Sequence, residues 1–133
     1  MALGSNIGDR AAHLAYARSR LGALPGTRLV AASDIEETAP IGPVAQPPFL
    51  NQMVLLETTL DPTALLAHCR AIEVERGREP PPRQRWGPRT LDLDIVRYGT
   101  KTVRSPDLTI PHPELPNRDF WQREIAELER EHG

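Results

Sequence analysis

The stretch Leu91-Asp92-Leu93-Asp94-Ile95-Val96-Arg97-Tyr98 begins with a strict alternation of apolar and acidic side chains. In a β-strand, alternate side chains lie on opposite faces of the sheet. The apolar side chains at the start of the stretch are therefore expected to face a core, while Asp92 and Asp94 share the other face. The sequence thus predicts a strand over residues 91–98 with one apolar face and one acidic face.

The rest of the chain predicts the remaining elements of an α+β domain. Strands are expected over residues 1–5, 28–36 and 49–59, and helices over residues 9–24, 62–76 and 119–131. Asp9 and Asp61 are suitable N-caps, because a short acidic side chain can accept hydrogen bonds from the first backbone N–H groups of a helix. The order β-α-β-β-α-β, followed by a C-terminal helix, is typical of a ferredoxin-like sandwich in which helices pack on a mainly antiparallel sheet.

Length and composition exclude several classes of protein. The 133 residues fit one domain, which is expected to span residues 1–133. The formal net charge of −2 argues against broad nucleic-acid binding, although every basic residue except Lys101 is Arg. No stretch is apolar enough to span a membrane and the start of the chain is not a signal peptide, so a cytoplasmic location is expected. The protein is also expected to be a monomer. The single cysteine, Cys69, excludes an internal disulfide.

The two aspartates are candidates for a metal site. Their Cα atoms are expected to lie roughly 6.6 Å apart on one face of the strand, and two such carboxylates repel each other unless a cation lies between them. Mg²⁺ is typically bound by one or two carboxylates together with substrate phosphates. Taken alone, an Asp-x-Asp pair is more typical of a solvated sheet face. The Arg-rich residues 83–90 just before it favour a polyphosphate site, because guanidinium groups bind phosphate oxygens.

Three further segments were candidates for function. Phe49 and Asn51 are expected on one face of a strand, where a ring and an amide could bind a flat polar heterocycle; a core Phe and a structural Asn are the alternative. His112, between two prolines, is by itself typical of a turn. The segment Gly4-Ser5-Asn6-Ile7-Gly8-Asp9 lacks the Lys and the spacing of a Walker A motif, so it predicts only a tight turn from strand to helix.

Several motifs occur along the chain in one order: Leu3-Gly4-Ser5-Asn6-Ile7-Gly8-Asp9, residues 38–42, Phe49-Leu50-Asn51, residues 85–95, Ile110-Pro111-His112-Pro113 and Asn117-Arg118. Together they resemble the 6-hydroxymethyl-7,8-dihydropterin pyrophosphokinases of folate biosynthesis, over nearly the whole chain. The run in residues 85–95 is the most specific of these motifs. The resemblance implies an enzyme that moves the β,γ-diphosphate of ATP onto the hydroxymethyl group of the reduced pterin and releases AMP.

The resemblance also implies the site residues. Asp92 and Asp94 match the family's ligands for two Mg²⁺ ions. Positions that bind the co-substrate ATP match Glu73, Arg78, Trp86, Arg89, Ile95, Thr109, His112 and Arg118, and catalytic positions match Arg78, Arg89 and Asp94. Pterin-binding positions match Thr38, Ala39, Ile41, Phe49, Asn51 and Phe120, with the two Phe rings expected to sandwich the pterin. No general base is assigned.

The chain departs from the family pattern in places, and other functions stay open. It is expected to be shortened at both ends relative to the family, and its loop at residues 79–82 is slightly longer. One alternative is a pterin- or nucleotide-binding protein without activity, against which the intact Asp92, Asp94 and Arg89 argue. A second is a single-stranded nucleic-acid module that stacks bases on Trp86 and Phe49, and a third is a ferredoxin-like interaction domain.

Overall fold

The computed structural model describes residues 1–39, 45–77 and 90–132. Its elements are, in order, β1 (Ala2–Ser5), α1 (Arg10–Gly22), β2 (Thr27–Ala32), β3 (Glu36–Thr38), β4 (Phe49–Thr58), α2 (Pro62–Glu75), β5 (Asp92–Asp94), β6 (Val103–Arg104), β7 (Thr109–Ile110), the 3-10 turn η1 (Leu115–Asn117) and α3 (Asp119–His132). Within these ranges, no helix is both long and apolar enough to cross a membrane.

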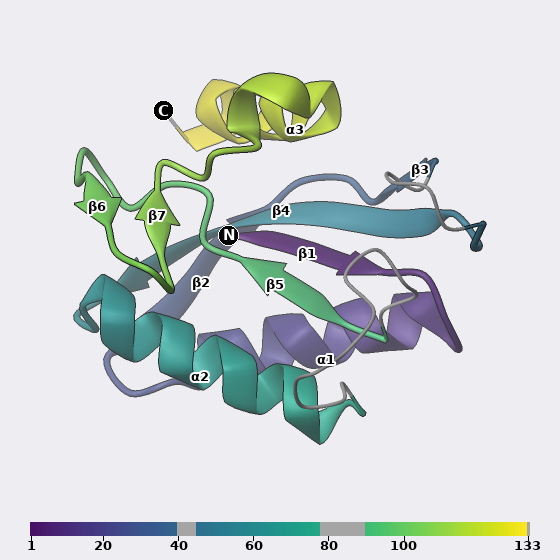
Figure 1. Ribbon diagram of the computed structural model, residues 1–133, viewed down its shortest axis with the longest axis horizontal. Coiled ribbons are helices and arrows are strands. Elements are labelled where there is room, and N and C mark those ends of the chain that lie inside the picture. The colour runs from purple at the N-terminus through teal and green to yellow at the C-terminus, as the bar shows by residue number, and fades with distance from the viewer. Residues whose placement is uncertain (40–44, 78–89, 133) are drawn as a thin grey trace.

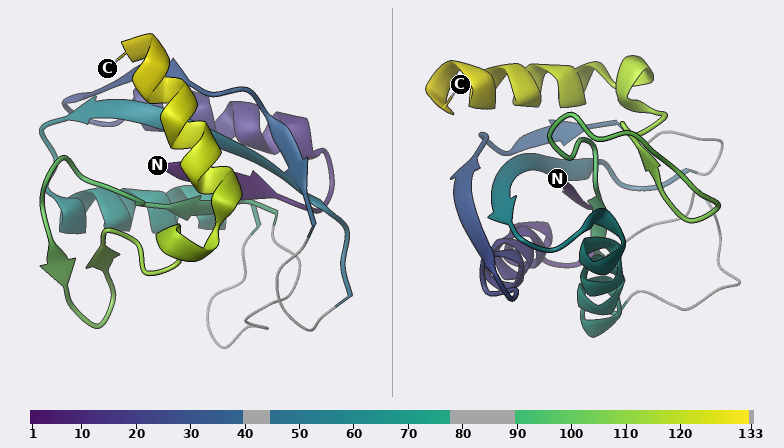
Figure 2. Two further views of the ribbon diagram at one scale, coloured as in Figure 1. Left: turned by 90° about the horizontal axis from the view of Figure 1, so that it is seen from above. Right: turned by 90° about the vertical axis from the view of Figure 1, so that its left-hand side faces the viewer.

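The main sheet has the strand order β2-β4-β1-β5, with β3 paired to the beginning of β4. Every pairing in it is antiparallel. Helices α1 and α2 cover one face of this sheet and α3 crosses the opposite face, as Figures 1 and 2 show. The predicted α+β, ferredoxin-like sandwich with an additional C-terminal helix is therefore confirmed.

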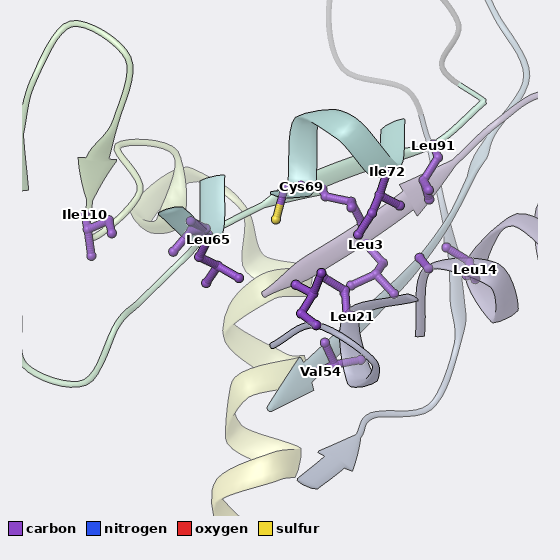
Figure 3. Packing of buried hydrophobic residues seen from close by; sticks show 13 residues of the cluster. Leu3, Leu14, Leu21, Val54, Leu65, Cys69, Ile72, Leu91 and Ile110 are labelled. Atoms are coloured by element: carbon purple, nitrogen blue, oxygen red, sulfur yellow. The ribbon is translucent and has the colours of Figure 1, made fainter. Parts of the chain in front are cut away.

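The face under α1 and α2 is a continuous apolar core (Figure 3). The strands contribute Leu3, Val54 and Leu93, and the helices contribute residues of which the largest are Leu14, Leu21, Leu65 and Ile72. Helix α1 places its buried residues three and four positions apart, which is the spacing of one helical face. Burying each of these large side chains contributes about 1.5–3 kcal/mol, so this face supplies much of the free energy of folding.

The helix ends follow from local sequence. The Asp9 carboxylate accepts a hydrogen bond from the backbone N–H of Ala12 at 3.1 Å, and Asp61 does the same for Ala64 at 2.8 Å. Both predicted N-caps are thus confirmed. Gly77 has a φ of +95°, a conformation that side-chain-bearing residues rarely adopt, and it follows the end of α2 as the sequence predicted.

Two predicted strands have other boundaries in the structure. The strand expected over residues 28–36 is interrupted at Ser33, so that β2 and β3 are separate strands and Thr38 is the last residue of β3. The strand expected over residues 91–98 is only three residues long, because its pairing with β1 ends at Ala2. Beyond it, the carbonyl of Val96 accepts a hydrogen bond from the backbone N–H of His112 at 2.9 Å. The small β6–β7 hairpin was not predicted.

Candidate active site

Two rows of side chains cross the sheet on the face toward α3. Gly4 on β1 pairs with Asn51 on β4 and with Asp92 on β5. Two residues earlier on β1, Ala2 pairs with Met53 on β4 and with Asp94 on β5. Because paired residues point to the same side of a sheet, the two aspartates and Asn51 share one face, with β1 between them.

This arrangement confirms the predicted alternation in β5. Leu91, Leu93 and Ile95 are buried in the core under α1 and α2, whereas Asp92 and Asp94 are half-buried. With strands about 4.8 Å apart, the backbones that carry Asn51 and Asp92 are separated by roughly 10 Å. Asn51, which is predicted to bind pterin, and the two aspartates, which are predicted to bind metal, therefore lie on neighbouring parts of one surface.

Asp94 lies in a positively charged environment. Its Oδ1 is 3.7 Å from Nε2 of His112. Burial alone would raise the pKa of Asp94, but the hydrogen bond and charge of His112, together with the charges of Arg118 and Arg70, outweigh burial and lower the pKa. The side chain is consequently a carboxylate at neutral pH and can act as a hard oxygen ligand.

His112 is held in place on three sides. Its backbone N–H donates to Val96, and its Nδ1 accepts a hydrogen bond from the backbone N–H of Glu114 at 3.0 Å. The imidazole also packs edge-on against Trp121, with ring centroids 4.9 Å apart. Because Nδ1 is an acceptor, the ring proton of the neutral form is on Nε2, the atom that faces Asp94.

Arg118 joins the same cluster through Trp121. Its guanidinium carbon lies 4.4 Å from the centroid of the Trp121 ring, within the range of a cation–π contact. Trp121 is buried, so it orients both Arg118 and His112. Trp121 was not among the predicted site residues. Its position three residues after Arg118, about one helical turn along, could have indicated that the two side chains lie side by side.

Asn51 and Thr38 form the other half of the candidate site. The Asn51 amide Nδ2 donates to Oγ1 of Thr38 at 2.5 Å, which fixes the orientation of the amide. A Cβ atom on Gly4 would lie 3.4 Å from Oδ1 of Asn51 and 3.5 Å from a ring carbon of Phe49. Both are ordinary van der Waals distances, so Gly4 lies directly beneath these two side chains.

The two predicted stacking rings differ in their surroundings. Phe49, at the start of β4, is half-buried and pairs with Thr38 of β3. Phe120 is buried in a second apolar cluster between α3 and the sheet, which includes Met53 and Val96. Ala39 is exposed just after β3.

Three of the predicted nucleotide-binding residues lie away from the two aspartates' face. Glu73 is fully buried under the sheet, where its carboxylate bonds to Leu93 and Arg70. Ile95 belongs to the apolar core, and Thr109 is exposed on β7. Four further predicted residues, Ile41, Arg78, Trp86 and Arg89, lie outside the described residues.

The donor set on β5 fits a magnesium ion that is shared with a substrate. Within the described ranges, no group of three or more His, Cys, Asp or Glu side chains is arranged to hold a metal ion. Asp92 and Asp94 supply two hard carboxylates on one face. Mg²⁺ commonly takes only one or two carboxylates from a protein and completes its coordination with phosphate oxygens and water.

A separate cavity of about 370 Å³ lies at the other end of β1, and its lining includes Met1, Val54, Tyr98 and Leu128. Its walls are mainly apolar, and neither Asp92 nor Asn51 lines it. Of the predicted site residues, Ile95 borders it. This cavity is therefore distinct from the surface that carries the aspartates.

Comparison with known proteins decides the family. The sequence pattern of the family 7,8-dihydro-6-hydroxymethylpterin-pyrophosphokinase (HPPK) matches residues 1–130. The chain belongs to this family. The predicted resemblance is thereby confirmed, and with it the prediction that the protein is an enzyme.

Curated relatives of this HPPK family member are similar over most of their length. The 2-amino-4-hydroxy-6-hydroxymethyldihydropteridine pyrophosphokinase of Pseudomonas aeruginosa is 41% identical over 96% of this chain and 78% of its own. The protein of the same name from Haemophilus influenzae is 41% identical over 90% of this chain and 74% of its own. That from Bacillus subtilis is 40% identical over 96% and 75% of the two chains.

Proposed function

We propose that this protein transfers the β,γ-diphosphate of ATP to the hydroxymethyl group of 6-hydroxymethyl-7,8-dihydropterin, a step of folate biosynthesis. The hydroxyl oxygen attacks the β-phosphorus, the bond from that phosphorus to the α,β-bridging oxygen breaks, and AMP leaves. The proton of the hydroxyl group passes to solvent. The products are the pterin diphosphate and AMP, so atoms and charge balance.

The observation that carries this proposal is the row in which Asn51, Gly4 and Asp92 cross one face of the sheet. An amide that can read a heterocycle and a carboxylate that can bind a metal are thus held by adjacent strands. The family membership indicates which group is transferred and which substrate accepts it. A transfer between two bound substrates depends mainly on such fixed positioning, which can contribute about 7–11 kcal/mol to lowering the barrier.

The acidic and basic residues are proposed to bind the triphosphate. Two bound Mg²⁺ ions would neutralise phosphate charge and orient the β-phosphorus for in-line attack. Asp92 and Asp94 would hold these ions. Arg118 and His112, which lie near Asp94, would bind phosphate oxygens. They would thereby stabilise the negative charge that develops on the leaving AMP. Arg78 and Arg89 are proposed as catalytic phosphate ligands, with Trp86, Ile95 and Thr109 on the nucleotide side.

The pterin is proposed to bind near the start of β4. Asn51, whose amide is oriented by Thr38, would form hydrogen bonds with the polar edge of the ring. Phe49 and Phe120 would pack against the two faces of the ring. Ala39 and Ile41 complete the proposed pocket.

An assay of AMP release tests the proposal directly. The protein is incubated with ATP, Mg²⁺ and 6-hydroxymethyl-7,8-dihydropterin, and parallel reactions each omit one component. We expect AMP only when all three are present, in a one-to-one ratio with the pterin diphosphate. AMP release without pterin, or none from the folded protein, would contradict the proposal. The second outcome would favour the alternative of a binding protein without activity, which equilibrium binding of each substrate would then test.

The other sequence-based expectations about the protein stay predictions. These are a single domain over residues 1–133, a monomer, a cytoplasmic location, and action on small molecules rather than on nucleic acid or membranes. Sedimentation of the purified protein with and without both substrates would test the oligomeric state.

A further inference from the structure

The outer edge of β5 is covered by side chains of α2. β5 lies at the edge of the main sheet, with β1 on one side. An edge strand normally leaves backbone N–H and C=O groups without partners. At Leu93 both groups are satisfied from α2: the N–H donates to Oε2 of Glu73 at 2.7 Å, and the C=O accepts from Nη1 of Arg70 at 3.2 Å.

Arg70 and Glu73 are also bonded to each other. Nη1 of Arg70 lies 2.7 Å from Oε1 of Glu73, three residues along the same helix. The Glu73 side chain is 1% exposed and that of Arg70 is 44% exposed, so one end of the pair is buried and the other reaches solvent. A buried carboxylate is stable only when its oxygens have partners. Here the partners include Arg70 and the backbone of Leu93, and the three residues form a closed ring of hydrogen bonds.

Leu93 is the residue between Asp92 and Asp94. Its side chain is buried in the core and its backbone is held by the Arg70–Glu73 pair. All three residues are in register with β1: Asp92 with Gly4, Leu93 with Leu3 and Asp94 with Ala2. Fixing Leu93 from outside the sheet therefore limits movement of both carboxylates.

We propose that Arg70 and Glu73 are positioning residues for the metal site, which hold the backbone of Leu93 and thereby the separation and direction of Asp92 and Asp94. This inference rests on the proposed function, in which these aspartates bind Mg²⁺. It gives Glu73 a role that differs from the nucleotide contact implied by the resemblance, because both carboxylate oxygens are directed at Arg70 and Leu93. Groups that orient metal ligands in this way typically matter nearly as much as the ligands.

The charge of Arg70 makes the proposal easy to distinguish from a simple electrostatic effect. Arg70 is close enough to interact with both Asp92 and Asp94. Removing a cation beside two carboxylates would, by charge alone, strengthen their binding of Mg²⁺. Loss of positioning would weaken it. The sign of the change in Mg²⁺ affinity in Arg70→Ala therefore separates the two effects.

A matched control lies on the same helix. Glu75 forms a double ion pair with Arg20 of α1, with both N–O distances 3.0 Å. This pair joins the two helices, and none of its hydrogen bonds involves β5. Glu75→Gln weakens an ion pair of α2 without touching Leu93, so it reports what loss of such a pair does to the fold alone.

The experiment uses backbone amide NMR signals of the full chain. Mg²⁺ is titrated in the presence of ATP while the signals of Asp92 and Asp94 are followed, and amide hydrogen exchange is measured at Leu93. Arg70→Ala and Glu73→Ala are expected to weaken Mg²⁺ binding roughly 10- to 100-fold and to speed exchange at Leu93. Glu73→Gln keeps an oxygen acceptor for Leu93, so it should recover most of the affinity. Glu75→Gln should change neither quantity.

Several results would overturn the proposal: tighter or unchanged Mg²⁺ binding in Arg70→Ala, an equal loss in Glu75→Gln, or no Mg²⁺-induced shift at the aspartates of the unaltered protein. If Glu73→Ala does not fold, the partly exposed Arg70→Ala and the near-isosteric Glu73→Gln decide the question. Absence of pterin-dependent AMP would contradict only the proposed function. The Mg²⁺ shifts and their loss in the variants would still support the positioning role.

Discussion

The two faces of the main sheet use the same three strands for different purposes. On the face toward α1 and α2, the strands present Leu3, Val54 and Leu93 to a continuous apolar core. On the face toward α3, the positions of these strands that point the other way include Asn51, Asp92 and Asp94. Stability and chemistry are therefore assigned to alternate positions of one strand, and neighbouring residues can be expected to fail in different ways when they are mutated.

The two faces also differ in how they treat charge. Among the described core residues under α1 and α2, the charged group Glu73 is bonded to Arg70 and to the backbone of Leu93. On the α3 side, Glu124 is 3% exposed. Burial, followed by the nearby carboxylate of Glu36, raises the pKa of Glu124 to about 9. The face with the candidate site thus holds a buried carboxyl group beside a second carboxylate, whereas the opposite face pairs its buried carboxylate with Arg70.

The sharpest test of this comparison is Asp94→Ala. The side chain faces the candidate site and not the core, so the change should leave the thermal unfolding temperature nearly unaltered. Turnover should fall by at least about 100-fold, the scale seen when one preorganised charged group is removed from an active site. Steady-state AMP release and a thermal melt measure the two quantities. Activity close to that of the unaltered protein would remove Asp94 from the site.

The neighbouring change Leu93→Ala should behave in the opposite way. It removes a fully buried side chain from the core under α1 and α2, and such changes cost about 2–5 kcal/mol of stability. Urea unfolding gives the free energy. A loss of activity without a loss of stability would show that the two faces are not separable at this strand.

Glu124→Gln tests the buried charge on the α3 side. Because the pKa of Glu124 is about 9 in the folded protein and 4.5 ordinarily, the folded protein binds the proton more tightly than the unfolded chain does. Its contribution to stability is fully present below pH 4.5 and is lost as pH rises toward 9. The variant should therefore be more stable by about 1–3 kcal/mol at pH 9 and no more stable at pH 4.5.

Urea unfolding of both proteins at pH 4.5, 7 and 9 checks this dependence. Arg123 pairs with the neighbouring Glu36 at 3.3 Å, so Arg123→Gln shows what loss of this ion pair alone does to stability. Parallel stability curves for Glu124→Gln and the unaltered protein would contradict the expected titration of Glu124.

Asn51→Ala should give the smallest effect. Loss of one hydrogen bond from its amide is expected to weaken pterin binding by about 0.5–1.5 kcal/mol, with a smaller effect on ATP. Calorimetric titration with each substrate separately measures both. If ATP binding were weakened more than pterin binding, the assignments of the two halves of the site would have to be exchanged.

Much of the fold could be predicted because it depends on local patterns. The alternation in residues 91–95 and the caps Asp9 and Asp61 are read from a few adjacent residues and were confirmed. The length of β5, the break at Ser33 and the β6–β7 hairpin depend on which distant strand is available for pairing. Local sequence does not contain that information.

The candidate site shows the same division. The shared face of Asp92 and Asp94 follows from strand geometry, as does that of Phe49 and Asn51. The resemblance to HPPK added Arg118 and Thr38 and gave His112 a role. The role of Arg70 could not be predicted, because it depends on how α2 packs against β5. For Trp121 the sequence offered its spacing from Arg118, but its contact with His112 depends on how α3 packs.

The alternation in β5 has a consequence for the evolution of the gene. Deleting or inserting one residue between Leu91 and Ile95 would exchange the two faces of the strand. Carboxylates would then enter the core while leucines faced the candidate site. In a mutational scan of this segment, the protein should therefore tolerate some substitutions but no insertion or deletion of a single codon. During evolution, the side chains of the segment can then change only while its length stays constant.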